Sequence, residues 1–174
     1  FPKAAAVEIQ SVDEFSAFTP MERIATAAET QALLAAHPGA PYLLFPEDRS
    51  LSIRMPGDIP GRWASAGPKG TIQGQAARGE YFTFQIGVWA ARQAISDLEV
   101  RFSDLVRTPT PAADGTAAAP AVIAAKDLTC FNKGGIGWDG APFTKTVPVE
   151  TGRVQALWCG VPVPRTIRPG GFKG

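Results

Sequence analysis

One segment of the sequence has the side-chain pattern of a β-strand along its whole length: Arg78-Gly79-Glu80-Tyr81-Phe82-Thr83-Phe84-Gln85-Ile86-Gly87-Val88-Trp89-Ala90-Ala91. Read with a period of two, every second residue from Phe82 to Ala90 is apolar. The intervening residues form a mixed face, made of Tyr81, Thr83, Gln85, Gly87 and Trp89. Because successive strand side chains point to opposite sides of a sheet, the pattern predicts a strand with one face in the core. Its aromatic and β-branched side chains suit a pleated, half-buried surface.

Length and charge restrict the class of protein. A chain of 174 residues can bury a sizeable core, and its hydrophobic fraction of 45% is ordinary for a globular domain. Seventeen basic and sixteen acidic side chains are interspersed and give a formal net charge of +1, which predicts binding to neither nucleic acid nor an anionic membrane surface. The sequence has no apolar run near the ~20 residues of a membrane helix. We therefore expect one β-rich domain over residues 1–174, with no membrane span.

A single short helix is predicted at about residues 26–37. Thr26-Ala27-Ala28-Glu29 has the form of a capping box, in which the Thr26 hydroxyl accepts from the Glu29 N–H and the Glu29 carboxylate accepts from the Thr26 N–H. Strong helix formers follow the box. The sequence His37-Pro38-Gly39 ends the helix, because proline cannot continue it and glycine adopts turn conformations freely.

Several other segments have strand-like patterns. The residues from Ile95 to Leu105 alternate most clearly, with Leu98, Val100 and Phe102 expected to point inward. This alternation is typical of antiparallel sheets with one solvated face, so we predict a mainly β fold, an antiparallel β-sandwich with long loops. The remaining strand candidates are Tyr42–Phe45, Leu51–Met55, Val122–Ile123, Leu128–Phe131, and a hairpin of Phe143–Val149 with Val154–Val163. Turns or loops are predicted at Pro46–Arg49, Pro56–Gly74 and Asn132–Gly140.

Two segments bear on domain organisation. Residues 106–120 are rich in alanine and proline and predict a flexible excursion at a loop tip. The segment Pro164–Gly174 looks like a turn that opens a further strand, at the point where the chain stops. Because an unpaired sheet edge is a liability for a natural domain, we expect the chain to be the amino-terminal part of a larger protein.

Cys130 and Cys159 are the two cysteines of the chain. Their spacing matches no zinc motif and the chain has a single histidine, so neither a metal site nor another cofactor is predicted. Two interpretations stay open for this pair. The thiols are either buried as small apolar side chains, or they form a disulfide in an oxidising compartment.

A glycine-rich segment and two acidic pairs resemble patterns found in binding or catalytic sites, but each has a simpler structural interpretation in this chain. The glycine-rich segment Lys133–Gly140 lacks the Gly-Lys-Ser/Thr ending of a P-loop and is interpreted as a structural loop. The adjacent acidic pairs Asp13-Glu14 and Glu47-Asp48 lie in polar stretches that would not raise a carboxyl pKa. We interpret them as solvated surface charges or as partners in a salt bridge to Arg49, and we assign no catalytic residue.

Exposed indole rings often stack on sugars or bases, although most aromatic residues at strand spacing belong to a core. Trp63 and Trp138 lie in predicted loops and are therefore candidate carbohydrate contacts, together with Asp139 beside Trp138. Trp158 lies in a strand candidate and is predicted to belong to the core.

A further pattern is formed by six segments: Phe18–Thr26, Tyr42–Arg49, Ile53–Met55, Arg78–Val88, Cys130–Asn132 and Val154–Trp158. Taken together, they resemble the amino-terminal region of glycoside hydrolase family 123 proteins. The resemblance implies an amino-terminal β-sandwich followed by a separate (β/α)8-type catalytic domain. It also implies removal of β-linked N-acetylgalactosamine, with help from the substrate's acetamido group and from an Asp-Glu pair beyond Gly174. Neither acidic pair of this chain matches that place.

Three functional hypotheses follow. In the first, the chain is a non-catalytic amino-terminal β-sandwich domain of a secreted or periplasmic family-123-like glycoside hydrolase, and it supports the C-terminal catalytic barrel or shapes its cleft. On this hypothesis Tyr81, Gln85 and Trp89 pack against the catalytic domain or against a second layer. In the second, the chain is a carbohydrate-binding module with Trp63 or Trp138 as a stacking platform. In the third, it is a self-contained hydrolase that uses a local carboxylate pair.

Overall fold

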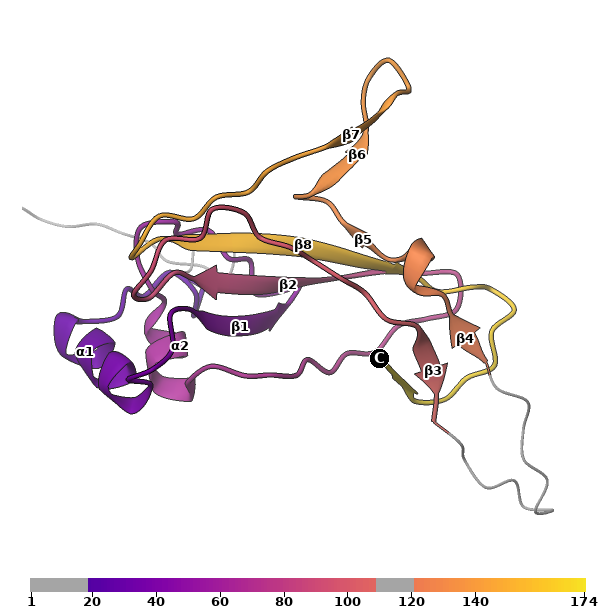
Figure 1. The fold of residues 1–174 in the computed structure, drawn as a ribbon. Coiled ribbons are helices and arrows are strands. Elements are labelled where there is room, and N and C mark those ends of the chain that lie inside the picture. Colours follow the sequence, from indigo (N-terminus) through magenta and orange to yellow (C-terminus); the bar gives the residue numbers. More distant parts are fainter. Residues whose placement is uncertain (1–18, 109–120) are drawn as a thin grey trace, which may run out of the picture.

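The computed structural model describes residues 19–108 and 121–174. Within these ranges the chain forms antiparallel sheets and few helices, which confirms the predicted mainly β fold (Figure 1). No helix in the described part of the chain is long and apolar enough to cross a membrane. The acidic pair Asp13-Glu14 and residues 109–120 of the alanine- and proline-rich segment lie outside the described residues.

The largest sheet is built from four strands: β1 (Leu43–Asp48), β2 (Tyr81–Trp89), β5 (Thr129–Cys130) and β8 (Val154–Pro162). Their order is β1-β2-β8-β5, so β2 and β8 lie at the centre (Figure 1). These two strands pair antiparallel along their whole lengths, from Tyr81 opposite Pro162 to Trp89 opposite Val154. The segment with the clearest strand pattern in the sequence is therefore a central strand of the fold.

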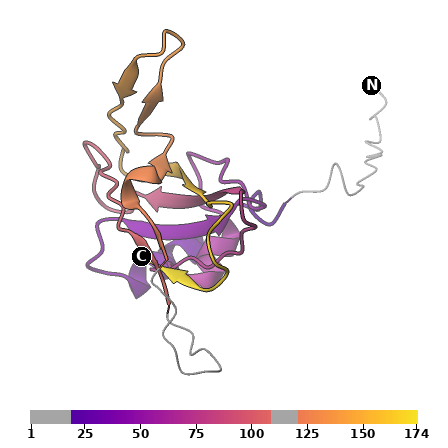
Figure 2. The same ribbon diagram turned by 90° about the vertical axis from the view of Figure 1, so that its right-hand side faces the viewer.

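Two smaller sheets extend from the large one. The first has the order β4-β3-β9 and consists of β3 (Leu105–Arg107), β4 (Val122–Ile123) and β9 (Phe172–Lys173), with the short helix η1 (Ala125–Asp127) after β4. The second is a hairpin of β6 (Gly134–Ile136) and β7 (Pro142–Thr144). This hairpin projects from the body of the molecule in both perpendicular views (Figures 1 and 2). We call residues 133–145 the arm.

The apolar face of β2 belongs to the core, as predicted. Val88 is buried in a cluster with side chains of β5 and β8, and Leu98, Val100 and Phe102 pack over that cluster. These three residues point inward as their alternation predicts, although residues 96–104 form no strand. Near the other end of β2, Phe82 packs in a cluster that it shares with the three-stranded sheet. This face is therefore covered by the chain that follows β2.

The mixed face of β2 is covered over only half of its length. Two helices, α1 (Ala27–Ala36) and α2 (Gly61–Ala66), contribute to a cluster on this side that buries Trp63 and Trp89. Trp63 stacks on Phe45 with ring centroids 4.3 Å apart and 2° between the ring planes. The indole fills the space above Gly87, where an added Cβ would lie 2.2 Å from the ring. The covered half is thus a second core.

All three predicted turns and loops contain regular structure, which in Asn132–Gly140 is the strand β6. Strand β1 runs through the predicted turn Pro46–Arg49 as far as Asp48, and it tolerates Pro46 because β1 is an edge strand. The predicted loop Pro56–Gly74 contains α2, which begins directly after Pro60. Sequence reasoning missed this helix because six residues among prolines and glycines give too short a pattern to recognise.

Two predicted strand arrangements are wrong. The segment Leu51–Met55 forms no strand, because the backbone N–H of Ile53 donates to the side chain of Gln85 at 2.9 Å instead of to a neighbouring strand. The hairpin of Phe143–Val149 with Val154–Val163 does not form either. Strand β7 pairs with β6, which comes from the glycine-rich segment, while β8 pairs with β2 and β5.

The capping box of α1 forms as predicted. The Glu29 N–H donates to the Thr26 hydroxyl at 3.2 Å, and the Thr26 N–H donates to the Glu29 carboxylate at 2.7 Å. The Arg23 guanidinium also donates to this carboxylate at 3.1 Å. The hydrogen bond from Arg23, followed by those from Thr26, lowers the pKa of Glu29 to about 2.

The lowered pKa of Glu29 predicts an acid-sensitive helix start. The folded-state pKa of about 2 lies below the ordinary value of 4.5. The stabilisation of the folded state by the charged Glu29 carboxylate is therefore fully present above about pH 4.5 and is lost as the pH falls through about 2. We expect Glu29→Gln to be less stable than the wild type at neutral pH, and the difference to shrink on acidification. Urea unfolding of both proteins across this pH window measures the difference. A difference that stays constant with pH would contradict the assignment.

The contact between Trp63 and Gly87 predicts a sharp size limit at this glycine. A Cβ at position 87 would also lie 3.2 Å from the Ile53 side chain, so Gly87→Ala should lower the free energy of unfolding by about 1–3 kcal/mol. Gly39→Ala is the matched control, because a Cβ at Gly39 has no neighbour within 4 Å. It should change stability by less than about 0.5 kcal/mol. Equal effects of the two substitutions in urea unfolding would contradict the predicted clash.

Candidate functional surface

The acidic pair Glu47-Asp48 stabilises the fold. Glu47 is buried, and its carboxylate accepts from Trp63 Nε1 at 2.9 Å and from Arg62 Nε at 3.2 Å. Both donors come from α2, so the carboxylate ties this helix to β1. The Asp48 carboxylate accepts from the Ser50 N–H at 2.8 Å, which lowers the pKa of Asp48. Glu47 is therefore not a solvated surface charge, and its salt bridge is to Arg62 rather than to the predicted Arg49, which pairs with Glu80.

Gln85 has a comparable structural role on the neighbouring strand. Its side chain is fully buried. The amide nitrogen donates to the carbonyls of Asp48 and Leu51, both at 3.4 Å, while the amide oxygen accepts from Ile53. Through these bonds Gln85 holds the segment after β1 against the sheet.

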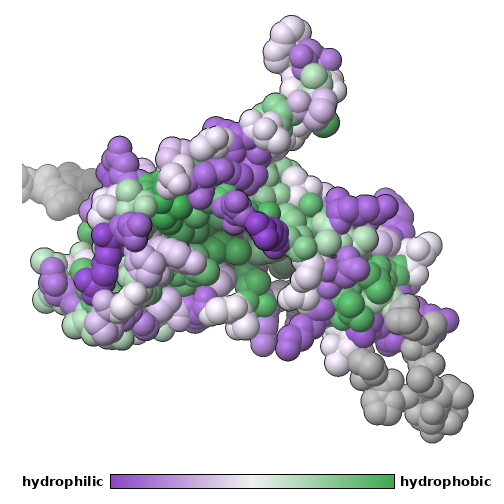
Figure 3. All heavy atoms as spheres, viewed as in Figure 1, coloured by the Kyte–Doolittle hydropathy of each residue, from purple (hydrophilic) through white to green (hydrophobic). Residues whose placement is uncertain are grey.

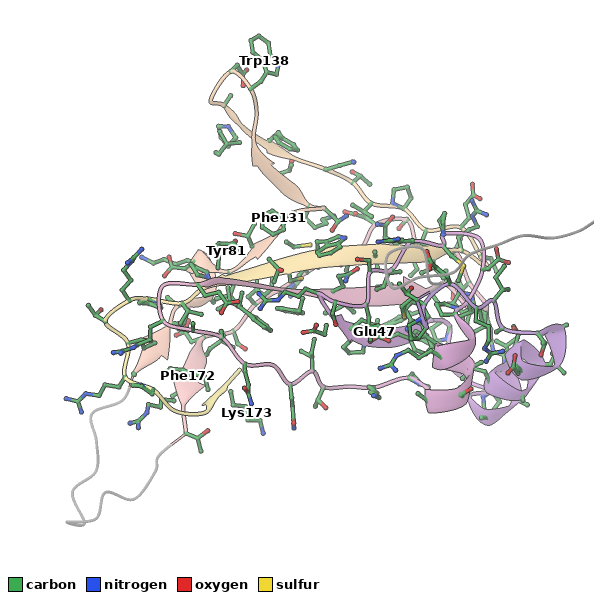
Figure 4. The ribbon with its side chains drawn as sticks, turned by 180° about the vertical axis from the view of Figure 1, so that it is seen from behind. Glu47, Tyr81, Phe131, Trp138, Phe172 and Lys173 are labelled. Carbon is green, nitrogen blue, oxygen red and sulfur yellow. The ribbon has the colours of Figure 1, made fainter. Side chains whose placement is uncertain are left out.

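Beyond Gln85, the same face of the sheet is only partly covered, because Thr83 and Trp158 are half-buried while Tyr81 and Phe131 are exposed. The register places Tyr81, Thr83 and Trp158 on this side, and Phe131 follows β5 beside them. Tyr81 and Phe131 are 43% and 48% exposed, and their ring centroids lie 6.0 Å apart (Figure 4). The Tyr81 ring lies across Gly160, where an added Cβ would be 2.2 Å from it. We call Tyr81, Thr83, Phe131 and Trp158 the open aromatic face.

The arm carries further exposed apolar side chains. Trp138 lies at its tip (Figure 4) and is fully exposed. Ile136 and Phe143 are exposed as well, and hydrophobic residues are visible on the projecting arm in the space-filling view (Figure 3). The tip is shaped by Asp139, whose carboxylate accepts from the Ala141 N–H at 3.0 Å. Because Trp138 is fully exposed, both faces of its indole ring are accessible to a ligand.

Polar contacts fix the base of the arm. The Lys133 ammonium donates to the Asp97 carboxylate at 2.5 Å, and the Val147 N–H donates to the same carboxylate at 2.7 Å. The first of these bonds is the main cause of the lowered pKa of Asp97. The Lys145 N–H donates to the Lys133 carbonyl at 2.8 Å. A hollow of about 450 Å³ beside this base is lined by both acidic and basic side chains, so it favours neither sign of ligand charge.

The three predicted carbohydrate contacts lie in two different environments. Trp138 and Asp139 lie together at the exposed tip of the arm. Trp63 is 2% exposed beneath the surface, so its ring faces cannot stack on a sugar.

The three residues predicted to pack against another domain also lie in two different environments, one buried and one exposed. Gln85 and Trp89 are covered by the helices and loops of this chain itself, which supply a second layer. Tyr81 is the member of this group whose side chain can reach another domain. Sequence reasoning missed Phe131, because the two residues of β5 before it are too few to show an alternation.

Comparisons with known proteins give little further information. No family model matches the chain, and no curated protein matches it. Among solved structures, a family 123 glycoside hydrolase from Clostridium perfringens, described for its hydrolysis of glycolipid glycans, is similar over 56% of this chain and 18% of its own length. The sequence identity is 16% and the TM-score 0.37. This is a weak and local likeness, and the chain covers less than a fifth of that hydrolase.

Proposed function

We propose that this chain is a non-catalytic β-domain of a secreted or periplasmic glycoside hydrolase similar to family 123. It supports a C-terminal catalytic barrel that acts on glycans with β-linked N-acetylgalactosamine. The open aromatic face is the observation that carries this proposal. Tyr81 and Phe131 present two neighbouring rings where the sheet has no covering layer among the described residues.

Two neighbouring exposed rings are better explained by contact with another domain than by exposure to solvent. Contiguous exposed apolar surface on a globular domain marks interaction sites. A tyrosine combines a large apolar ring with a polar hydroxyl, which suits a boundary that is partly wet. The other half of the same sheet face shows what a covering layer does here, because α1 and α2 bury Trp89 there.

The carboxyl groups support a non-catalytic role. The pKa values of Glu22, Glu29, Asp48, Glu80 and Asp97 are all lowered by hydrogen bonds to backbone N–H groups or to cationic side chains. These groups are therefore charged at neutral pH. A glycosidase needs one carboxyl group that holds its proton at the working pH. Their environment suits structural ion pairs and caps, and the proposal places the chemistry in the other domain.

The open aromatic face predicts that Tyr81 matters more in a longer protein than in this chain alone. With the catalytic domain attached, Tyr81→Ser should destabilise the protein by about 1–2 kcal/mol more than it does in the 174-residue chain. Tyr42→Ser is the matched control, because Tyr42 is 47% exposed next to the start of β1, at the far end of β2 from Tyr81. Thermal unfolding of both lengths measures the difference.

Two results would count against the proposal. The first is an equal effect of Tyr81→Ser in the two lengths, no larger than that of Tyr42→Ser. The second is turnover of a chromogenic N-acetylgalactosaminide by the 174-residue chain alone, since the proposal assigns turnover to the longer protein.

One observation favours a second function, that of a carbohydrate-binding module. The fully exposed Trp138 indole at the arm tip can stack on a sugar ring. If it does, calorimetric titration with an oligosaccharide ending in β-linked N-acetylgalactosamine should show binding that Trp138→Ala abolishes. Ile136→Ala, on the same arm and also exposed, should leave binding unchanged. Binding that survives Trp138→Ala, or no binding by the wild type, would exclude this platform.

A further inference from the structure

The two cysteines meet across the sheet. Cys130 on β5 lies directly opposite Cys159 on β8 in the antiparallel register. At the next pair, the Phe131 N–H donates to the Trp158 carbonyl at 2.9 Å. Because hydrogen-bonded and non-hydrogen-bonded pairs alternate along an antiparallel ladder, the two cysteines form a non-hydrogen-bonded pair. Opposite Cα atoms in such a pair lie about 4.5 Å apart, within the roughly 4.4–6.8 Å that a disulfide spans.

The two thiols have different environments. Both are free and buried, but Cys159 is fully covered on the central strand β8, whereas Cys130 lies on the edge strand β5. The Cys159 thiol beside it, and then the backbone N–H groups of Asn132 and Lys133, lower the pKa of Cys130. The neighbouring Cys130 sulfur and burial raise the pKa of Cys159. Cys130 is thus the more reactive sulfur, because the thiolate is the nucleophile.

We propose that Cys130 and Cys159 are an oxidation site at which a peroxide converts the two thiols into a cross-strand disulfide. This site is independent of the proposed domain function.

The reaction balances with hydrogen peroxide as the oxidant. The Cys130 thiolate attacks one peroxide oxygen, the O–O bond breaks, and the other oxygen leaves as hydroxide, which takes up a proton to become water. The product is a sulfenic acid on Cys130. The Cys159 sulfur then displaces the sulfenic hydroxyl, which leaves with the Cys159 proton as a second water. Two thiols are oxidised to one disulfide, and one peroxide is reduced to two waters.

The disulfide would fix the base of the arm. Strand β5 has two residues and leads directly into the arm, so its hold on β8 rests on few backbone bonds. A covalent link from Cys130 to Cys159 joins the two ends of a segment that contains the whole arm. Such a link lowers the conformational entropy of the unfolded chain and holds β5 against β8 in the folded chain.

Mass spectrometry tests the proposal on the folded chain. Hydrogen peroxide should leave no alkylatable thiol, yield a monomer lighter by two hydrogen atoms, and give a proteolytic peptide pair linked through Cys130 and Cys159. The unfolding midpoint should rise by about 5–10 °C, and hydrogen exchange at the Phe131 amide should slow. The same treatment in urea should form the disulfide more slowly, because the register that aligns the thiols is lost.

Single substitutions test the role of Cys130 as the sulfur that attacks the peroxide and the role of Cys159 as the sulfur that closes the disulfide. Cys159→Ser should leave a Cys130 sulfenic acid that a sulfenic-acid-specific nucleophile traps, whereas Cys130→Ser should leave Cys159 unreacted. Two intact thiols after treatment of the folded wild-type chain would overturn the proposal. So would disulfide-linked dimers as the main product, or faster bridging in urea than in the native chain. These wild-type measurements decide the matter even if a cysteine variant fails to fold.

Discussion

The position of one indole ring sets the arrangement of the central sheet and the helices. Trp63 stacks on Phe45, the edge of its six-membered ring lies over the bare backbone of Gly87, and its nitrogen donates to the buried Glu47 carboxylate. Each part of this arrangement requires the others. A larger residue at Gly87 would push the ring away, and without the indole N–H the carboxylate would lose one of its two donors in the interior. The helix α2, the strand β1 and the strand β2 are thereby fixed relative to one another.

The same strand, β2, takes part in two kinds of surface. From Gln85 to Trp89 its mixed face is closed by the chain's own helices and by the segment that Gln85 holds. At Tyr81 that face is open, and Phe131 extends it sideways. Among the described residues, the core is therefore complete over one half of this face, and Tyr81 and Phe131 stay exposed on the other half. This division, more than any single residue, makes an interface the best explanation of the open part.

Two sequence patterns predicted their elements correctly, whereas the alternation from Ile95 to Leu105 formed no strand over residues 96–104. Nine residues of β2 alternate without interruption, and the capping box of α1 is a local motif, so both could be predicted. Pairings between distant segments could not. The glycine-rich segment supplies β6, and β7 pairs with β6 rather than with β8, because register and topology depend on contacts that no local pattern encodes. The buried state of Trp63 and Glu47 was missed for the same reason, since each is explained only by the other.

In the arm, the residues that attach it to the body are separate from the residues that are exposed at its tip. Its contacts with the body lie at its base, through Lys133 and Asp97, while Trp138 stands free at the tip. Exchanging residues at the tip leaves the packed interior untouched, and loop tips tolerate insertions and deletions. Substitutions at the tip can therefore accumulate without disturbing the packing of the core.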